Sequence, residues 1–176
     1  MLLTERLIIR PFLKSDYQDL YEYLSQEETY RFERGEPISI EKAKIFARDW
    51  SKGTNFWAAT LKESRKLIGH VSLFPERPPF FKTWQIGYIY IPDFQNMGYA
   101  SEATLAVIKF VFSDLGAHRI VAYCSPDNIP SWKVLEKCGM KKEGLSRKDF
   151  ILRDDKNGKP VWLDSYTYAI LDEDMI

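Results

Sequence analysis

The stretch that decides the fold runs from Trp84 to Gly116 and reads WQIGYIYIPDFQNMGYASEATLAVIKFVFSDLG. Residues 84–91 are apolar on both faces of an extended chain, which predicts a strand in a sheet covered on both sides. Apolar side chains then recur at helical spacing from Ala100 to Leu115, so we expect a long helix that ends at the following glycine. The stretch therefore predicts a buried strand, a glycine-containing loop over residues 92–98 and a helix.

This loop is a predicted anion site. The first amides of a helix have no partner in a preceding turn, and the helix dipole adds partial positive charge beside them, so phosphate is a common occupant. Gly98 and the small Ala100 allow a bulky anion to approach the backbone. The loop fits neither the P-loop nor the triple-glycine dinucleotide fingerprint. The alternative is a plain strand–helix connection in which Gly98 serves only the turn.

Composition indicates one globular domain over residues 1–176, with 45% apolar and 15% aromatic residues. The 25 basic and 25 acidic residues balance, which gives no electrostatic case for nucleic acid or membrane as a general partner. The sequence shows no secretory leader and no apolar run of membrane-spanning length, so we expect a cytoplasmic protein. Cys124 and Cys138 are predicted to be buried free thiols, and the two histidines lack metal-ligand spacing, so no metal site is predicted.

The rest of the chain predicts the element order β-α-α-β-β-β-α-β-α-β-β. Residues 26–38 are irregular, acidic and aromatic, and the proline-rich residues 75–83 form a loop that exposes Phe80 and Phe81. The expected strands cover residues 4–11, 55–61, 66–74, 84–91, 118–124, 140–153 and 161–171.

Two segments resemble the GCN5-related N-acetyltransferases, the GNAT superfamily. Residues 95–100, QNMGYA, resemble the signature Gln/Arg-x-x-Gly-x-Gly/Ala, and residues 128–140 resemble the family's Asn-x-x-Ser…Leu-x-Lys-x-Gly-Phe segment. The opening Thr4–Pro11 resembles the branch that acetylates the N-termini of ribosomal proteins. The resemblance implies a single-domain α/β (α+β) fold with a mixed, mostly antiparallel sheet of six to seven strands, flanked by helices. It also implies that strands 84–91 and 118–124 splay apart, where the alternative is an ordinary parallel pair.

The resemblance implies direct transfer of acetyl from acetyl-coenzyme A, a co-substrate, to a primary amine without an acyl-enzyme. The pantetheine arm would pair with exposed backbone at Ile89, Tyr90 and Ile91, and an amide near Ile91 would polarise the acetyl carbonyl. Backbone amides would hold the pyrophosphate, since many relatives carry Gly and a cation where this chain has Asn96 and Met97. The predicted pyrophosphate residues are Gln95, Asn96, Met97, Gly98, Tyr99 and Ala100.

Four residues of the segment after the 118–124 strand are further candidates. By resemblance, Asn128 would hydrogen-bond the pantetheine, and Ser131 would hydrogen-bond the sulfur as thiolate leaves, either directly or through water. Asn128 also fits the cap of a helix with Pro130 in its first turn, and both roles can hold at once. Lys133 and Lys137 share a helix face and could meet the 3′-phosphate, or form a solvated basic face.

The catalytic base is the open part of the prediction. An attacking amine needs a proton acceptor, and many relatives have Glu where this chain has Gln85, which cannot accept the proton. Glu33 is the substitute candidate, although solvated surface charge is the alternative for any glutamate in that segment. The cluster Glu27, Glu28, Glu33 and Glu36 could also attract a cationic amine.

The predicted function is acetylation of a protein N-terminal amine. The alternatives are acetylation of a small amine such as a polyamine or an antibiotic, and a non-catalytic coenzyme A-binding module, which the absence of a glutamate at position 85 keeps open. The sequence does not identify the acceptor amine, and it is compatible with a monomer or a homodimer.

Overall fold

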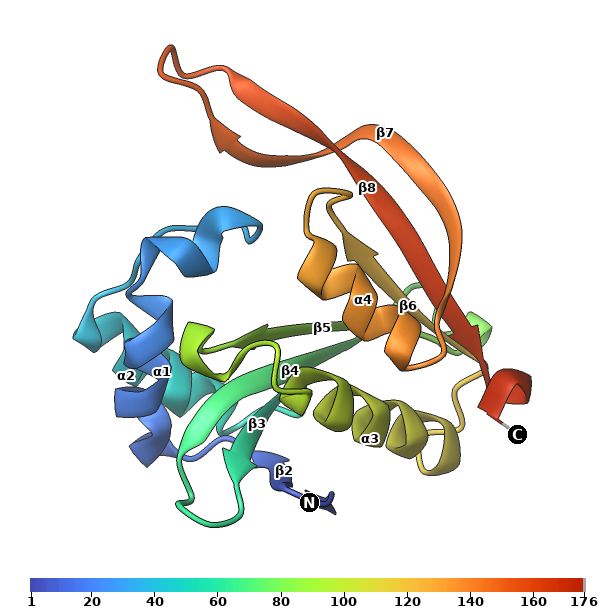
Figure 1. Ribbon diagram of the computed structural model, residues 1–176, viewed down its shortest axis with the longest axis horizontal. Coiled ribbons are helices and arrows are strands. Elements are labelled where there is room, and N and C mark those ends of the chain that lie inside the picture. Colours follow the sequence, from blue (N-terminus) through green and yellow to red (C-terminus); the bar gives the residue numbers. More distant parts are fainter. Residues whose placement is uncertain (176) are drawn as a thin grey trace.

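The computed structural model of the chain describes residues 1–175, in which eight strands form one sheet in the order β1-β2-β3-β4-β5-β6-β8-β7 (Figure 1). The α/β class and the flanking helices are as predicted. One strand more is present than the six to seven expected, because the two residues of β1 pair with β2 at Leu2 and Ile9. The strands are β1 (Leu2–Leu3), β2 (Leu7–Pro11), β3 (Phe56–Leu61), β4 (Leu67–Pro75), β5 (Thr83–Tyr90), β6 (Arg119–Cys124), β7 (Lys141–Asp154) and β8 (Pro160–Leu171).

Four α-helices cover the two faces of this sheet (Figure 1). Ser39 begins the second of them, since its side chain accepts a hydrogen bond from the Lys42 amide at 3.3 Å. Two 3₁₀ turns also matter below: η2 (Glu27–Arg31) and η4 (Pro92–Phe94). The helices are α1 (Tyr17–Leu24), α2 (Ile40–Trp50), α3 (Tyr99–Ser113) and α4 (Ile129–Lys137).

Strand β5 lies between two apolar cores, as its two apolar faces predict, although most of its side chains are half-buried. Ile86 and Tyr90 belong to the core beneath α3 and α4. Ile91, which follows the strand, belongs to a second core with Leu20 of α1 and Ala43 of α2. The strand therefore separates two cores, and its C-terminal end leads directly into the predicted anion loop.

The predicted splay between β5 and β6 is present. These strands form the one parallel pair of the described sheet, and they pair only between Thr83–Gln85 and Arg119–Val121. Beyond this point β5 continues along β4 to Tyr90, whereas β6 continues along β8 to Cys124. The sheet therefore opens at the C-terminal ends of both strands.

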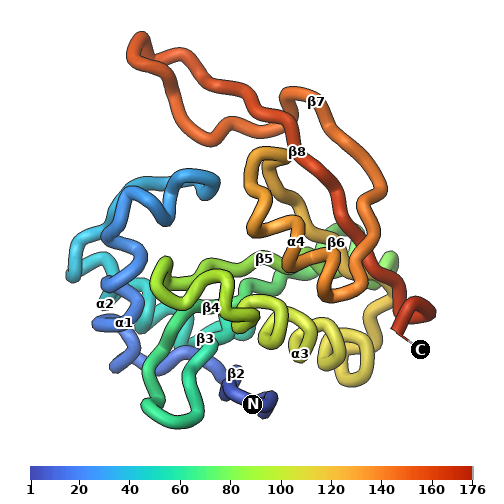
Figure 2. The backbone as a smooth tube through the Cα atoms, in the orientation of Figure 1, coloured from blue at the N-terminus to red at the C-terminus, as the bar shows by residue number. Residues whose placement is uncertain are grey.

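The η2 segment and the start of α4 lie on opposite sides of this opening, and the β7–β8 hairpin reaches beyond the body of the fold (Figure 2). Cys124 and Cys138 are buried free thiols and Phe80 and Phe81 are exposed, which confirms both predictions. Among the helices of residues 1–175, none has the length and apolar character that crossing a membrane requires.

Candidate active site

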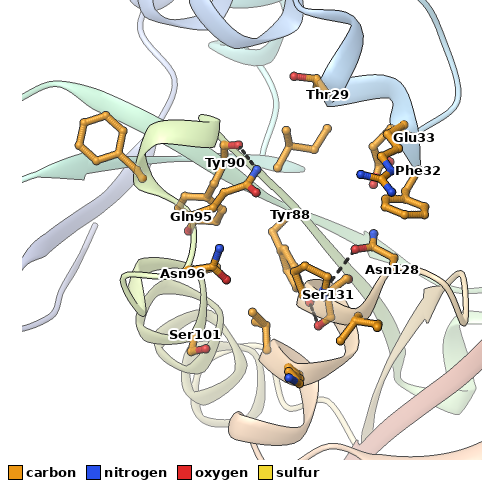
Figure 3. A pocket seen from close by; sticks show the side chains of 18 of the residues that line it. Thr29, Phe32, Glu33, Tyr88, Tyr90, Gln95, Asn96, Ser101, Asn128 and Ser131 are labelled. Atoms are coloured by element: carbon orange, nitrogen blue, oxygen red, sulfur yellow. Dashed lines mark hydrogen bonds between the residues drawn. The ribbon is translucent and has the colours of Figure 1, made fainter.

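A cleft of about 480 Å³ lies at the opening of the sheet (Figure 3). One wall comes from η2 and the residues after it, and the other comes from the loop before α3 and the start of α4. The end of β5 forms the floor. Of the sequence-predicted residues, the cleft brings together Glu33, Ile89, Tyr90, Gln95, Asn96, Gly98, Ala100, Asn128, Ser131, Lys133 and Lys137.

The loop before α3 presents a run of unpartnered amides. Within residues 1–175, no acceptor is recorded for the backbone N–H groups from Asn96 to Ser101. Asn96 and Gly98 both have positive φ angles, of 59° and 84°, which turn successive amides toward one side. Met97 and Tyr99 are not among the residues that line the cleft, so their side chains do not take part in its wall. The loop has the geometry of an anion-binding concavity at a helix start.

The backbone of β5 that faces the opening differs from the prediction. The Ile91 amide donates to the Ile68 carbonyl at 2.9 Å, and the Glu76 amide donates to the Thr83 carbonyl at 2.9 Å. In an antiparallel ladder alternate residues bond to the same neighbour, so the odd-numbered residues of β5 bond to β4. The prediction is therefore wrong for Ile89 and Ile91 and right for Tyr90, whose amide faces the gap, and Tyr88 offers its backbone there as well. A pattern apolar on both faces does not reveal which residues bond to which neighbour.

Side chains also form hydrogen bonds beside this exposed edge of β5. Gln95 donates from its side-chain nitrogen to the Tyr90 carbonyl at 3.0 Å and so holds the loop against β5. The Tyr88 hydroxyl donates to the Ser131 carbonyl at 2.7 Å and lies 3.2 Å from Ser131 Oγ. Burial raises the pKa of Tyr88, so this hydroxyl remains protonated. Sequence reasoning missed Tyr88, because a tyrosine in a buried strand is ordinarily a core residue.

Asn128 and Ser131 lie at the start of α4. The Asn128 side chain accepts from the Ser131 amide at 3.3 Å and Pro130 lies in the first turn, so the predicted cap is confirmed. Both residues also line the cleft, where Glu33 and Phe32 face them from the opposite wall (Figure 3). Lys133 and Lys137 follow on the same wall and make it basic.

Glu33 is one of three carboxylates in the described chain that line the cleft, with Glu28 and Asp127. Its side chain remains open to solvent on one side, but the surrounding walls desolvate it and raise its pKa to about 7. Of the other members of the predicted acidic cluster, Glu28 lines the cleft, where it pairs with Arg31 at 3.5 Å. Glu27 and Glu36 are not among the lining residues.

A second cavity, of about 250 Å³, opens from the same gap toward the other face of the sheet. The two cavities share Glu33, Tyr88, Ile89 and Ser131, so they meet where the strands part. Further lining residues of the second cavity are Phe56, His70, Ser72, Gln85 and Tyr123.

His70 in this wall is buried and uncharged. Burial lowers its pKa to about 3, and its Nδ1 lies 2.7 Å from the Tyr23 hydroxyl. The aromatic rings of Phe12, Trp50 and Phe56 surround it. His70 is therefore a packed histidine of the core.

A sheet that opens beside an amide-lined loop, with one cavity on each side of the opening, has room for two molecules that meet where the strands part. The sequence profile of the family described as "Acetyltransferase (GNAT) domain" matches residues 6–141. The chain belongs to this family. It is an N-acetyltransferase of the GNAT type, and acetyl-coenzyme A is its co-substrate.

Three comparisons describe its relatives. The chain is 37% identical over 175 residues to the "Uncharacterized N-acetyltransferase YnaD" of Bacillus subtilis, covering 97% of this chain and 96% of the relative. A crystal structure of a GNAT-family acetyltransferase from Bacillus anthracis has a TM-score of 0.88 at 32% identity and covers 98% of each chain. The "[Ribosomal protein uS5]-alanine N-acetyltransferase" of Escherichia coli is 25% identical over 165 residues, 87% of this chain and 84% of that protein.

Proposed function

We propose that the chain acetylates the N-terminal amine of a protein or peptide. The observation that carries this proposal is the meeting of the two cavities at Glu33, Tyr88 and Ser131. Coenzyme bound in the larger cavity would present its thioester at this junction, and an amine in the smaller cavity would reach it from the other face. The acetyl group would then pass directly from the thioester to the amine, without an acyl-enzyme intermediate.

The larger cavity suits each part of the coenzyme. The amides of residues 96–101 would bind the pyrophosphate, and Lys133 and Lys137 would bind the 3′-phosphate. The pantetheine arm would run along the backbone of Tyr88 and Tyr90, which faces the gap. It would take the position that β6 would occupy if it continued beside β5. The amide of Tyr88, rather than that of Ile91, would donate to the acetyl oxygen as negative charge develops there.

The transfer step follows from this arrangement. The neutral amine attacks the carbonyl carbon, a C–N bond forms, and the C–S bond breaks. The pKa of Glu33, about 7, suits a general base at neutral pH, so Glu33 takes the proton that the amine releases. Ser131 donates a hydrogen bond to the departing sulfur, and the Tyr88 hydroxyl, which donates to the Ser131 carbonyl at 2.7 Å, holds the turn that carries Ser131. The thiolate then takes a proton from water.

The composition of the second cavity supports a peptide N-terminus as the acceptor. Among its lining residues in the described chain, none is Lys or Arg and Glu33 is the one carboxylate, while Ser72 and Gln85 offer neutral hydrogen bonds. A free amino acid would bury its carboxylate there without a counter-charge, and a polyamine would bury more positive charge than one glutamate balances. A peptide N-terminus carries one ionisable amine followed by a neutral amide. The similarity to the uS5-alanine acetyltransferase agrees with this choice.

The small size of the second cavity favours a second candidate, a small monoamine. The buried free thiols Cys124 and Cys138 suit a reducing compartment such as the cytoplasm for either function.

Release of coenzyme A with a matched set of acceptors tests the proposal. Phenylalanine and phenylalaninamide differ only in the carboxylate, so the amide and short peptides should be acetylated while the free amino acid and spermidine are poor acceptors. Equal rates with phenylalanine and phenylalaninamide would refute the argument from the uncharged cavity. A peptide that is inert beside a reactive small amine would favour the second candidate. Thermal stabilisation by coenzyme A without turnover of any amine would contradict both.

A further inference from the structure

The segment before β2 packs behind the anion loop, which is distant from it in sequence. The Arg6 side chain donates from Nε to Glu102 Oε2 at 2.7 Å, and the Arg6 amide donates to Glu102 Oε1 at 2.8 Å. The Thr4 hydroxyl donates to the same Oε1 at 2.5 Å. Glu102 lies in the first turn of α3, so these bonds join the N-terminal segment to the start of the helix.

The guanidinium of Arg6 also holds the loop itself. Its Nη1 donates to the Met97 carbonyl at 3.0 Å. Its central carbon, Cζ, lies 4.3 Å from the centre of the Tyr99 ring. In a trans peptide the C=O and the following N–H point in opposite directions. A bond that draws the Met97 carbonyl toward Arg6 therefore directs the Gly98 amide away from Arg6.

That amide belongs to the cleft side of the loop. Gly98 lines the cleft, whereas Arg6, Met97 and Tyr99 are not among its lining residues. Arg6 Nη2 also lies 3.3 Å from where a Cβ on Gly98 would stand, which locates the guanidinium directly behind the glycine. Arg6 thus supports the loop from the back without taking part in the cleft wall.

The contact between Arg6 and Glu102 is an ion pair at neutral pH. Partial burial opposes ionisation of Glu102, but hydrogen bonds from Thr4 and Arg6 outweigh that effect and lower its pKa. The hydrogen bond from Glu102 raises the pKa of Arg6. The Glu102 side chain is 16% exposed and that of Arg6 is 41% exposed, so the carboxylate is the better shielded of the two. Glu102 lies in the first turn of α3, where its charge complements the helix dipole, and it also anchors Arg6.

We propose that Arg6 is a positioning residue that holds the anion loop in its binding conformation before the coenzyme arrives. The inference rests on the proposed role of the loop in pyrophosphate binding. A loop with its amides already aligned loses less conformational freedom when the anion binds. Arg6 therefore strengthens coenzyme binding through Met97 and Gly98 and has no part in the chemical step.

Calorimetric binding of coenzyme A and of ADP, together with steady-state kinetics, tests this role. Arg6→Gln should weaken both ligands about tenfold and raise KM for acetyl-coenzyme A by a similar factor, with kcat within about twofold of wild type. Arg10→Gln is the matched control, because Arg10 also lies at the N-terminus and pairs with a carboxylate, Asp16, at 2.7 Å. The control should lose thermal stability but keep its affinity for both ligands.

Arg6→Lys distinguishes the positioning effect of the guanidinium from the effect of its positive charge. It also serves as the test variant if Arg6→Gln does not fold. A lysine keeps the charge, but one ammonium cannot reproduce the guanidinium fork between Glu102 and Met97 and its stacking on Tyr99, so KM should remain raised. Wild-type affinity in Arg6→Gln, or full rescue by lysine, would overturn the proposal. If the wild-type protein itself failed to bind coenzyme A or ADP, that result would refute the proposed role of the loop in pyrophosphate binding. The positioning role of Arg6 depends on that role and would be refuted with it.

Discussion

The two sides of the opened sheet are built in different ways. In the proposed function, the coenzyme side relies on backbone groups, namely the amides of residues 96–101 and the edge of β5, with Lys133 and Lys137 beside them. The proposed acceptor side is lined by side chains from separate elements, with Phe56 on β3, Ser72 on β4 and Gln85 on β5. A backbone site tolerates many side chains, whereas a side-chain site changes with each substitution. The comparison suggests that the coenzyme side preserves the reaction while the acceptor side sets which amine is used.

The largest expected effect comes from distorting the backbone cradle with Gly98→Arg. The φ of Gly98 is 84°, and a Cβ there would lie 3.3 Å from Arg6 Nη2, so the new side chain strains the loop, displaces Arg6 from behind it and disturbs the alignment of its amides. We expect coenzyme affinity to fall at least about 100-fold, which corresponds to about 2.7 kcal/mol, while circular dichroism shows a retained fold.

Gly158→Arg is the control for this variant, since Gly158 also has a positive φ, of 73°, but a Cβ there meets nothing within 4 Å. It should bind coenzyme A as the wild type does. Micromolar binding retained by Gly98→Arg would contradict the backbone cradle.

The corresponding variant where the two cavities meet is Glu33→Gln. Removing a general base lowers turnover by about 100-fold or more, while coenzyme affinity should stay unchanged because glutamine keeps the shape. Stopped-flow or steady-state release of coenzyme A measures the rate, and calorimetry measures the affinity. Glu28→Gln, a neighbouring carboxylate on the cleft wall, should have little effect. Equal losses in the two glutamine variants would indicate general attraction of a cationic amine instead of proton transfer.

The contrast between the two sides also explains what the sequence could predict. The loop of residues 95–100 and the Asn128–Ser131 turn are local patterns, so the strand, loop and helix around them, and the splay that the family implies, could all be predicted. The free backbone of β5 was predicted correctly at Tyr90 but wrongly at Ile89 and Ile91, because the hydrogen-bonding register depends on the bond from Ile91 to Ile68 of another strand.

Contacts between distant segments were the part that could not be predicted. Tyr88 meets Ser131, and Arg6 meets Glu102 and Met97, only after the chain has folded. Glu33 could be predicted as a candidate base, but its place in the cleft wall could not. No local pattern in the sequence determines its pKa. Single-sequence patterns report periodicity and turns, and they carry no signal for such tertiary pairs.

A smaller effect is expected from Ser131→Ala at the junction of the two cavities. The loss of one hydrogen bond to a developing thiolate should lower kcat about tenfold and leave coenzyme affinity nearly unchanged. Ser101→Ala, which removes a hydroxyl from the wall of the coenzyme cleft, should leave kcat unaltered. Unchanged turnover in Ser131→Ala would remove Ser131 from the chemical step and leave only its place in the α4 turn.

The smallest expected effect is the pH dependence of stability that Glu33 introduces. Its pKa rises from 4.5 to about 7 in the folded protein, so the folded state favours the protonated form. The stability that this protonation contributes is fully present below pH 4.5 and is lost as the pH rises through 7. Glutamine cannot ionise, so Glu33→Gln should gain Tm relative to wild type between pH 5 and pH 8. The gain should be at most about 2 °C, because the carboxylate is open to solvent on one side. Thermal unfolding at several pH values measures it, and a Tm difference that is constant with pH would show that the cleft walls do not desolvate this carboxylate, which would weaken its case as the base.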